Sequence, residues 1–353
     1  MTQKPLSSII LAAGDGKRLR SQVPKALHQI CGRPMIVHIL RSIEGLIDKK
    51  QVVVVGFASE MLEDALRDYH VDFAFQEKRL GTGHAVICTK QFFPPDERCD
   101  IIVLVGDAPL LTRQTIEKLI ERHRHQDASA TVLTTKMKNP AGYGRILRHG
   151  DNTIMSIVED KDANIYEKKV NEINTGTYIF DSVDLFEALD QVKPNNEQGE
   201  YYLTDVIHIM VQQKKRVEAY VTRDTWETMG INNRVQFAKA ERIMRNRILE
   251  RLMLSGVTIV DPESTFIDDS VSIGIDSIIH PTTYIFGETV IGDGCNIGPL
   301  TQIEDSEIGA NCRVNSSYLR GCTIPPGMSI GPFANLQHGE IIYANANTAK
   351  KIS

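Results

Sequence analysis

Residues 267–303 read IDDSVS IGIDSI IHPTTY IFGETV IGDGCN IGPLTQ I, with an isoleucine at every sixth position. A step of six fits neither the 3.6-residue period of a helix nor the two-residue period of an ordinary strand. It fits short strands that each point one aliphatic side chain inward and then turn a corner. The step continues in fives and sixes through Ile308, Val314, Leu319, Ile324 and Ile330. We predict a β-solenoid for this part of the chain.

Immediately before the solenoid, the pattern predicts one helix over residues 233–255. Its apolar side chains recur at spacings of three and four, the signature of a helix face: Phe237, Ala240, Met244, Ile248 and Leu252. Gly256 is a plausible helix end. We therefore expect a domain over residues 1–232, a linker helix over 233–256 and a solenoid domain over 257–353.

The first part of the chain alternates short apolar runs with amphipathic stretches. The runs predict strands at residues 8–12, 52–56, 71–75, 101–105, 131–135, 154–158, 177–180 and 217–221. The amphipathic stretches predict helices at residues 35–44, 59–68, 83–91, 113–122, 183–189 and 203–212. Strands that are apolar on both faces and separated by helices favour an α/β fold with a mostly parallel sheet covered by helices. Ligands bind beyond the carboxyl ends of the strands in such sheets.

Composition excludes several classes of protein. The 353 residues carry 40 Lys and Arg against 45 Asp and Glu, for a net charge of -5. This argues against a general nucleic-acid binder, which needs a basic surplus. No apolar run approaches the roughly 20 residues of a membrane helix. The six cysteines are scattered without a C-x-x-C pair, so we expect free thiols, and a cytoplasmic protein.

A candidate phosphate-binding loop follows the first predicted strand, in LAAGDGKRLR (residues 11–20). Gly14 and Gly16 would let backbone N–H groups approach phosphate oxygens, and Arg18 and Lys25 supply positive charge. G-x-G alone is better explained by an ordinary strand-to-helix turn, and it is the addition of Arg18 and of Lys25 after Pro24 that favours a phosphate loop. The loop is neither a Walker loop nor the dinucleotide fingerprint, since the residues that complete those motifs are missing.

The loop and the motifs after it resemble the sugar-1-phosphate nucleotidyltransferases. More narrowly, they resemble the bacterial N-acetylglucosamine-1-phosphate uridyltransferases of the GlmU family. The order and spacing agree across the first domain in these motifs: LAAGDGKRLRSQVPKALHQICGRPMI (11–36), QEKRLGTGHA (76–85), VGDAP (105–109), GYGR (142–145), IVEDK (157–161), EINTG (172–176), QGEYYLTD (198–205) and GINNR (230–234). The resemblance implies a Rossmann-like nucleotidyltransferase domain followed by a left-handed parallel β-helix.

The implied reaction is transfer of the uridylyl group from UTP to N-acetylglucosamine-1-phosphate, with release of pyrophosphate and with Mg²⁺ as cofactor. The attacking phosphate oxygen is already an anion, so catalysis would consist of positioning and charge neutralisation. The resemblance assigns Arg18 and Lys25 as catalytic residues. It assigns Asp107 and Asn232 as Mg²⁺ ligands, whose oxygens suit that ion.

The resemblance divides the remaining substrate-binding residues among three groups. The first loops would border the substrates through Leu11, Ala12, Ala13, Gly14 and Gly106, and Gly14 would hold the phosphates with Arg18 and Lys25. The uracil would meet Gln76, Gly81 and Thr82, with the Gln76 amide offering one donor and one acceptor. The sugar would meet Gly144, Glu159 and Asn174, and Asn232 would also border the substrates. We expect His28, His38 and His84 to be structural.

Plainer interpretations of four of these residues remain open. Asp107 could cap a turn, Gln76 could lie in a surface loop, and Glu159 could form a surface ion pair with Lys161. Asn232 could be a turn residue beside Asn233.

The chain departs from the family after the first coils of the β-helix. Asn335 follows Gly-Pro-Phe-Ala (331–334), where family members carry a basic residue, and the later lysine and histidine motifs are absent. We therefore expect no acetyltransferase activity. The resemblance also implies a homotrimer formed through the β-helix. Three alternatives remain: a relative with another sugar phosphate or nucleotide, a non-catalytic scaffold, and, less favoured, a hexapeptide acyltransferase.

Overall fold

A computed structural model describes residues 3–14, 16–56 and 59–337. The chain divides into two compact units, Met1–His28 with Pro34–Phe237, and Gln29–Arg33 with Ala238–Ser353. The second unit thus includes a short piece of the N-terminal sequence, a detail that the expected boundaries at 232 and 256 do not contain. Those boundaries stay a prediction. No helix in the described ranges is long and apolar enough to cross a membrane.

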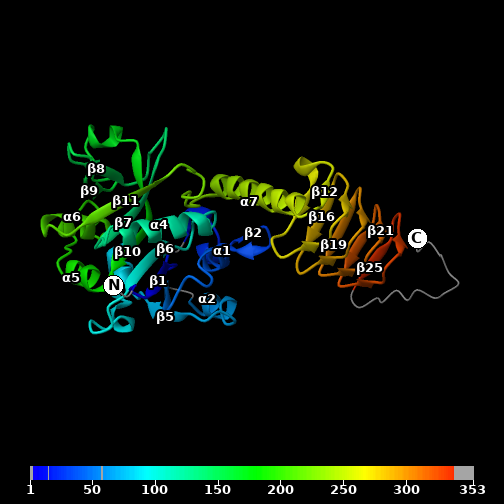
Figure 1. The fold of residues 1–353 in the computed structure, drawn as a ribbon, viewed down its shortest axis with the longest axis horizontal. Coiled ribbons are helices and arrows are strands. Elements are labelled where there is room, and N and C mark those ends of the chain that lie inside the picture. Colours follow the sequence, from blue (N-terminus) through cyan, green and yellow to red (C-terminus); the bar gives the residue numbers. More distant parts are fainter. Residues whose placement is uncertain (1–2, 15, 57–58, 338–353) are drawn as a thin grey trace. The chain divides into compact units, whose positions relative to one another are not determined.

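The first unit is built on one mixed sheet of nine strands (Figure 1). Its strands are β1 (Leu6–Leu11), β4 (Gln51–Val55), β5 (Asp72–Phe75), β6 (Asp100–Val105), β7 (Ala130–Lys136), β8 (Arg145–Arg148), β9 (Ile154–Val158), β10 (Glu172–Asp181) and β11 (Val217–Thr222). The order is β11-β7-β10-β6-β1-β4-β5, and β8 and β9 extend from β10 as an antiparallel pair. β1, β4, β5 and β6 run parallel, as the apolar runs predicted, while β10 runs antiparallel to both of its neighbours.

Helices cover both faces of this sheet. They are α1 (Met35–Ser42), α2 (Ser59–Ala65), α3 (Thr82–Ile87), α4 (Arg113–His125), α5 (Ser182–Leu189) and α6 (Thr204–Gln212). Ile9 belongs to a core with α3, α5 and α6, while its neighbour Ile10 belongs to a second core with α1, α2 and α4. Alternate strand residues thus face opposite cores, which explains the unbroken apolar runs.

The expected strand at 177–180 is longer in the structure, because β10 begins at Glu172. Its first half is polar, and the pairing with β7 shifts register between Asn174 and Tyr178. Gly176 lies within this shift, at φ +81°. A polar sequence with an internal glycine weakens a strand prediction, although a bulge of this kind keeps the strand in the sheet.

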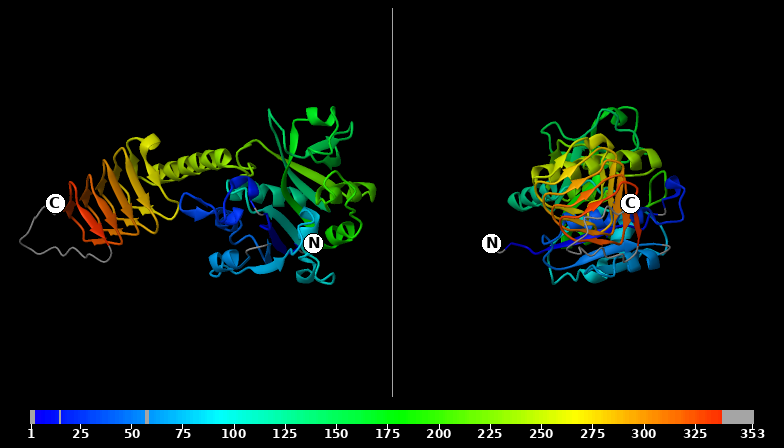
Figure 2. Two further views of the ribbon diagram at one scale, coloured as in Figure 1. Left: turned by 180° about the vertical axis from the view of Figure 1, so that it is seen from behind. Right: turned by 90° about the vertical axis from the view of Figure 1, so that its right-hand side faces the viewer.

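Two elements precede the coils in the second unit. They are a hairpin of the strands β2 (Gln29–Ile30) and β3 (Arg33–Pro34), of which Gln29–Arg33 belong to this unit, and the helix α7 (Arg234–Leu254), which belongs to it from Ala238 on; of the two, only α7 runs directly into the coils. Figure 2 shows α7 as one uninterrupted helix, as the sequence predicted.

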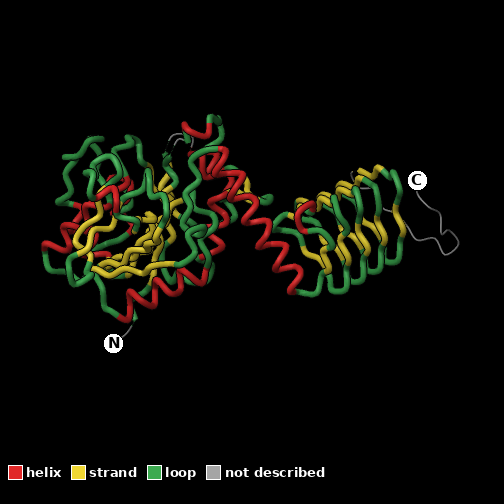
Figure 3. Tube along the Cα trace, turned by 90° about the horizontal axis from the view of Figure 1, so that it is seen from above, coloured by secondary structure: helices red, strands yellow, loops and turns green. Residues whose placement is uncertain are grey.

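The rest of the second unit is a parallel β-helix, in which the chain visits three sheets in turn. Its strands are β12 (Thr258–Ile259), β13 (Phe266–Ile267), β14 (Ser272–Ile273), β15 (Ile278–Ile279), β16 (Thr283–Phe286), β17 (Val290–Ile291), β18 (Asn296–Ile297), β19 (Thr301–Glu304), β20 (Glu307–Ile308), β21 (Arg313–Val314), β22 (Tyr318–Arg320), β23 (Thr323–Ile324), β24 (Ser329–Ile330) and β25 (Asn335–Gln337). The sheets are β12-β15-β18-β21-β24, β13-β16-β19-β22-β25 and β14-β17-β20-β23. Figure 3 shows the successive coils.

The six-residue step places one aliphatic side chain of each strand inside the coil. Ile267 pairs with Ile285, Ile285 with Ile303, and Ile303 with Leu319. All of these side chains are at most 2% exposed. The solenoid prediction is therefore confirmed, and the interior is a column of stacked aliphatic residues.

Candidate functional site

The candidate site lies where the parallel strands of the first unit end. Three backbone bonds join the loops that follow these strands: Gly106 N–H donates to the Leu11 carbonyl at 2.9 Å, Ala12 N–H to Val54 at 2.9 Å, and Gln76 N–H to Val55 at 2.8 Å. Carboxyl ends of parallel strands therefore converge here, as the fold class predicts for a ligand site.

Four of the predicted residues meet at one point. The Lys25 ammonium donates to Asp107 Oδ2 and, at 2.8 Å, to Asn232 Oδ1. Arg18 Nη2 donates to the same Asn232 oxygen at 2.8 Å. The Lys25 and Asp107 side chains are only 13% and 26% exposed. Two cationic donors and two oxygen acceptors thus share a half-buried site.

Local backbone contacts bring these side chains together. Gly16 has φ +60°, and a Cβ there would lie 3.0 Å from the Cβ of Lys25. Glycine thus permits this close approach of the first loop. Lys25 itself begins a short 3₁₀ helix, Lys25–Leu27. On the other side, Ile231 N–H donates to the Asp107 carbonyl at 2.9 Å, which brings the GINNR segment to the end of β6.

A cavity of about 300 Å³ adjoins this cluster. It is lined by residues from the first loop, from the segment around α3 and from the end of β6: Leu11, Ala13, Gly14, Gln76, Arg79, Gly81, Thr82, Ala85, Val105, Asp107 and Glu200. Seven of the residues predicted from the sequence lie in this lining. The predicted phosphate loop and the predicted base-binding residues therefore border one space.

Gln76 is a buried residue of this cavity and does not lie in an open surface loop. Its side chain Nε2 donates to the Gly81 carbonyl at 3.0 Å and lies 3.1 Å from His84 Nδ1. With His84 Nδ1 as acceptor, both amide hydrogens are engaged and Oε1 remains to accept from a ligand. The sequence predicts that the Gln76 amide offers the base one donor and one acceptor. In this arrangement it offers only the acceptor, Oε1. His84, which we expect to be structural, thus orients the Gln76 side chain, and only the fold brings the two residues together.

Gly81 and Thr82 are held by the segment that precedes α6. Gly81 has φ +104°, and a Cβ there would lie 2.5 Å from the Tyr201 carbonyl. Gly83 N–H donates to that carbonyl at 2.8 Å, and Leu203 N–H donates to Thr82 Oγ1 at 3.1 Å. The GTG motif (81–83) and the YYLTD motif (201–205) therefore pack directly against each other.

The three predicted sugar-binding residues form a second group around β8, β9 and β10. Asn174 N–H donates to the Gly144 carbonyl at 2.9 Å. A Cβ at Gly144 would lie 3.4 Å from Glu159 Oε1 and 3.5 Å from the Asn174 Cβ. The alternative partner of Glu159, Lys161, donates to Gln198 at 2.6 Å. The structure thus brings these three residues together.

Burial raises the pKa of Glu159 above its usual value near 4.5. Thr204, which donates to Oε1 at 3.3 Å, opposes this shift, and the carboxylates of Asp162 and Asp205 add to it. A half-buried carboxylate with few charged donors is suited to accept hydrogen bonds from sugar hydroxyl or amide groups.

The oxygen cluster fits the implied Mg²⁺. The Lys25 ammonium marks a point that Asp107 Oδ2 and Asn232 Oδ1 both contact. One carboxylate and one amide oxygen around a single cation are typical of Mg²⁺ sites, which complete their shell with water and substrate phosphates.

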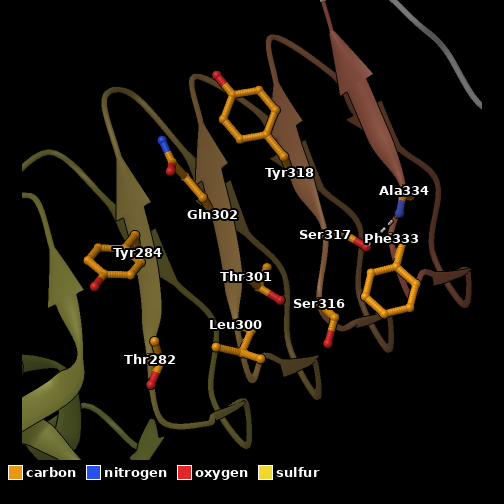
Figure 4. A pocket seen from close by; sticks show the side chains of 10 residues that line it. All are labelled: Thr282, Tyr284, Leu300, Thr301, Gln302, Ser316, Ser317, Tyr318, Phe333 and Ala334. Atoms are coloured by element: carbon orange, nitrogen blue, oxygen red, sulfur yellow. Dashed lines mark hydrogen bonds between the residues drawn. The ribbon is translucent and has the colours of Figure 1, made fainter.

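The second unit carries a cavity of its own, of about 430 Å³, on the sheet that contains β16, β19 and β22 (Figure 4). Leu300 and Phe333 border it at corners two coils apart, with Ser316 at the corner between them, and are 65% and 84% exposed. Tyr284, Gln302 and Tyr318 lie in a row on the outer face of the sheet. None of the predicted site residues lines this cavity.

Comparison with known proteins agrees with the motifs. Residues 7–241 match the family model described as nucleotidyl transferase. The relatives include "Bifunctional protein GlmU" of Halalkalibacterium halodurans, 42% identical over 336 residues, which cover 95% of this chain and 73% of the relative. The protein of the same name from Acetivibrio thermocellus is 44% identical over 340 residues, covering 96% and 73%. That from Streptococcus agalactiae is 42% identical over 332 residues, covering 94% and 72%.

Proposed function

Because the chain belongs to the nucleotidyl transferase family, among the GlmU proteins, we propose that it transfers a uridylyl group from UTP to N-acetylglucosamine-1-phosphate. The products would be UDP-N-acetylglucosamine and pyrophosphate. The observation that carries the proposal is the convergence of Arg18 and Lys25 with Asp107 and Asn232 beside a cavity. We place the reaction in the cytoplasm.

In this mechanism a phosphate oxygen of the sugar-1-phosphate attacks the α-phosphorus of UTP, and the bond to the pyrophosphate oxygen breaks. The nucleophile is an anion, so the barrier comes from charge repulsion and orientation. Arg18 and Lys25 would neutralise the phosphates. Asp107 and Asn232 would hold Mg²⁺, which supplies further neutralisation of the phosphate oxygens when bound.

Before substrates bind, Lys25 neutralises Asp107 and so keeps both side chains in the site. At the base, the free acceptor Oε1 of Gln76 suits the N3–H of uracil. At the sugar, Glu159 and Asn174 would contact the hydroxyl and acetamido groups. Each of these side chains would orient a substrate, and orientation contributes to catalysis in such a reaction beside charge neutralisation.

The decisive experiment measures pyrophosphate release from UTP and Mg²⁺ with three sugar phosphates in parallel: N-acetylglucosamine-1-phosphate, glucosamine-1-phosphate and glucose-1-phosphate. We expect strong turnover with the first only. Preference for another sugar would keep the metal and phosphate residues but reassign the sugar group. No turnover from folded protein would favour the non-catalytic scaffold.

We also propose that the chain does not transfer acetyl groups, because Asn335, an exposed residue of β25, replaces a basic residue of the family. Release of free thiol from acetyl-coenzyme A in the presence of glucosamine-1-phosphate tests this. Sustained thiol release would contradict it.

Finally, we propose a homotrimer formed through the β-helix. The exposed apolar corners at Leu300 and Phe333 support a surface that another copy covers. Size-exclusion chromatography with light scattering should give a trimer, and substitution of both residues by serine should shift it toward monomer. A wild-type monomer would contradict the assembly.

A further inference from the structure

The hairpin β2–β3 turns through Cys31 and Gly32, with φ values of +44° and +80°. Two successive residues in the left-handed region make the tight turn that suits a two-residue hairpin. Glycine adopts that region freely, whereas a cysteine there carries a conformational cost. The cost implies that other contacts hold Cys31 in place.

Those contacts come from α7 and from the first coil. The Glu241 carboxylate accepts the Cys31 backbone N–H at 3.1 and 3.2 Å, and its Oε1 lies 3.5 Å from the thiol sulfur. Asp269 N–H donates to the Cys31 carbonyl at 3.0 Å. Asp268 packs on Gly32 so closely that a Cβ there would lie 2.5 Å from Oδ2. Cys31 is 4% exposed. Its turn is therefore buried, and it is held by α7 on one side and by the first coil on the other.

The contact of Cys31 with Glu241 is one of three contacts between residues 25–31 and residues 232–241. The first is Lys25 with Asn232, at 2.8 Å. The second is His28 with Phe237, whose ring centroids are 6.0 Å apart in an edge-to-face arrangement. The third is Cys31 with Glu241. The chain between Lys25 and Cys31 is thus tied to the chain between Asn232 and Glu241 at both ends and in the middle.

Helix α7 also holds Asn232 directly, since Gln236 Oε1 in its first turn accepts the Asn232 backbone N–H at 2.7 Å. Met35 N–H donates to the His28 carbonyl at 3.0 Å and closes the base of the hairpin. One helix therefore bonds to Asn232 through Gln236 and, five residues later, to the hairpin through Glu241.

We propose that Glu241 is a positioning residue, which sets Lys25 relative to Asn232 and Asp107 through the Cys31 hairpin and thereby tunes binding of the nucleoside triphosphate. This rests on the proposed function, in which Lys25 contacts the phosphates of UTP. Glu241 does not touch substrate in this proposal. Loss of its carboxylate leaves the buried Cys31 N–H without its acceptor, which destabilises the turn and favours a relaxed hairpin.

The test compares three single variants of the full chain. Glu241→Ala removes the acceptor, Glu241→Gln keeps an oxygen for the Cys31 N–H, and Glu250→Ala removes the same charge from an exposed position of α7. Circular dichroism confirms folding. Steady-state kinetics give KM for Mg-UTP and for the sugar phosphate separately, and calorimetry measures Mg-UTP binding without the sugar.

We expect Glu241→Ala to raise KM and Kd for Mg-UTP about tenfold, equivalent to roughly 1.4 kcal/mol, and to leave KM for the sugar phosphate unchanged. Glu241→Gln should restore values within about twofold of wild type, and Glu250→Ala should match wild type. If the alanine variant does not fold, Glu241→Asp, which shortens the reach by one methylene group, replaces it.

Equal changes for both substrates in a folded variant, or no change in UTP binding, would overturn the positioning role. Wild-type protein that binds Mg-UTP without turning over any sugar phosphate would end the proposed function, while the calorimetric comparison would still decide the role of Glu241. Wild-type protein that binds no Mg-UTP would overturn both.

Discussion

The two units of this chain differ in how far apart in the sequence their contacting residues lie. In the β-helix, each inward residue packs on its equivalent one coil away, as Ile285 does on Ile303. In the site, Lys25 contacts Asp107 and Asn232, which are 82 and 207 positions away. In the β-helix, a substitution removes one of many similar contacts, and the others remain. In the site, each contact is made once, so a substitution removes it entirely. Chemistry should therefore be far more sensitive to substitution in the first unit than in the second.

Asp107→Ala should show this sensitivity most strongly. Removing the carboxylate deletes the proposed Mg²⁺ ligand and the partner of Lys25, and we expect kcat for pyrophosphate release to fall about 10³-fold, or roughly 4 kcal/mol. The matched control is Asp68→Ala, an exposed aspartate. Full activity in a folded Asp107→Ala protein would remove Asp107 from the mechanism.

Ile303→Ala tests the second unit with a buried side chain in the middle of the column. Truncation of a buried isoleucine costs about 2–5 kcal/mol, so the β-helix should unfold at lower denaturant concentration. The single tryptophan, Trp226, lies in the first unit, so its fluorescence follows that unit while circular dichroism follows both. We expect an early transition by circular dichroism only. Coincident early transitions would show that the units do not unfold separately.

Gly81→Ala probes the packed contact beneath the cavity. The added Cβ meets the Tyr201 carbonyl at a left-handed backbone position, so a loss of about 1–3 kcal/mol in stability is expected, together with weaker UTP binding. Gly142→Ala is the control, since Gly142 has φ +83° with no described atom within 4 Å of its Cβ. Equal effects of the two substitutions would assign the loss to backbone strain alone.

The smallest expected effect is the pH dependence caused by Glu159. Its raised pKa means that the folded chain binds this proton more tightly than the unfolded chain does. Its contribution to the unfolding free energy is therefore full below about pH 4.5 and is lost as pH rises through the raised pKa. Denaturation across this range should show a shallower fall for Glu159→Gln than for wild type. Identical slopes would exclude Glu159 as the source.

The sequence predicts the β-helix nearly coil by coil, because its core depends on a local period that a reader can count. It predicts the central strands for the same reason, since each is a short apolar run. The hairpin at Cys31–Gly32 escapes prediction, because its turn lacks the usual Asn or Asp and depends on Glu241, far along the chain. The contact of His84 with Gln76 escapes for a related reason, because no spacing rule links the two residues.

The candidate site residues were predicted from motifs rather than from physical pattern. A lone aspartate or glutamine after a strand has many possible uses, and only the family resemblance selected these. The structure then adds what motifs do not contain, such as the shared contact of Arg18 and Lys25 with one Asn232 oxygen.

The stacked coils also bear on how such a chain can change in evolution. Ile267, Ile285 and Ile303 stand 18 residues apart, one full circuit of the three sheets. Because each circuit contacts only its neighbours, duplication or deletion of a whole circuit preserves every remaining contact type. The circuits of this chain vary little in length, from 18 residues between Ile267 and Ile285 to 16 between Ile303 and Leu319. Inherited changes of length in this region should therefore come in multiples of about 18 residues, and the catalytic unit would be spared each time.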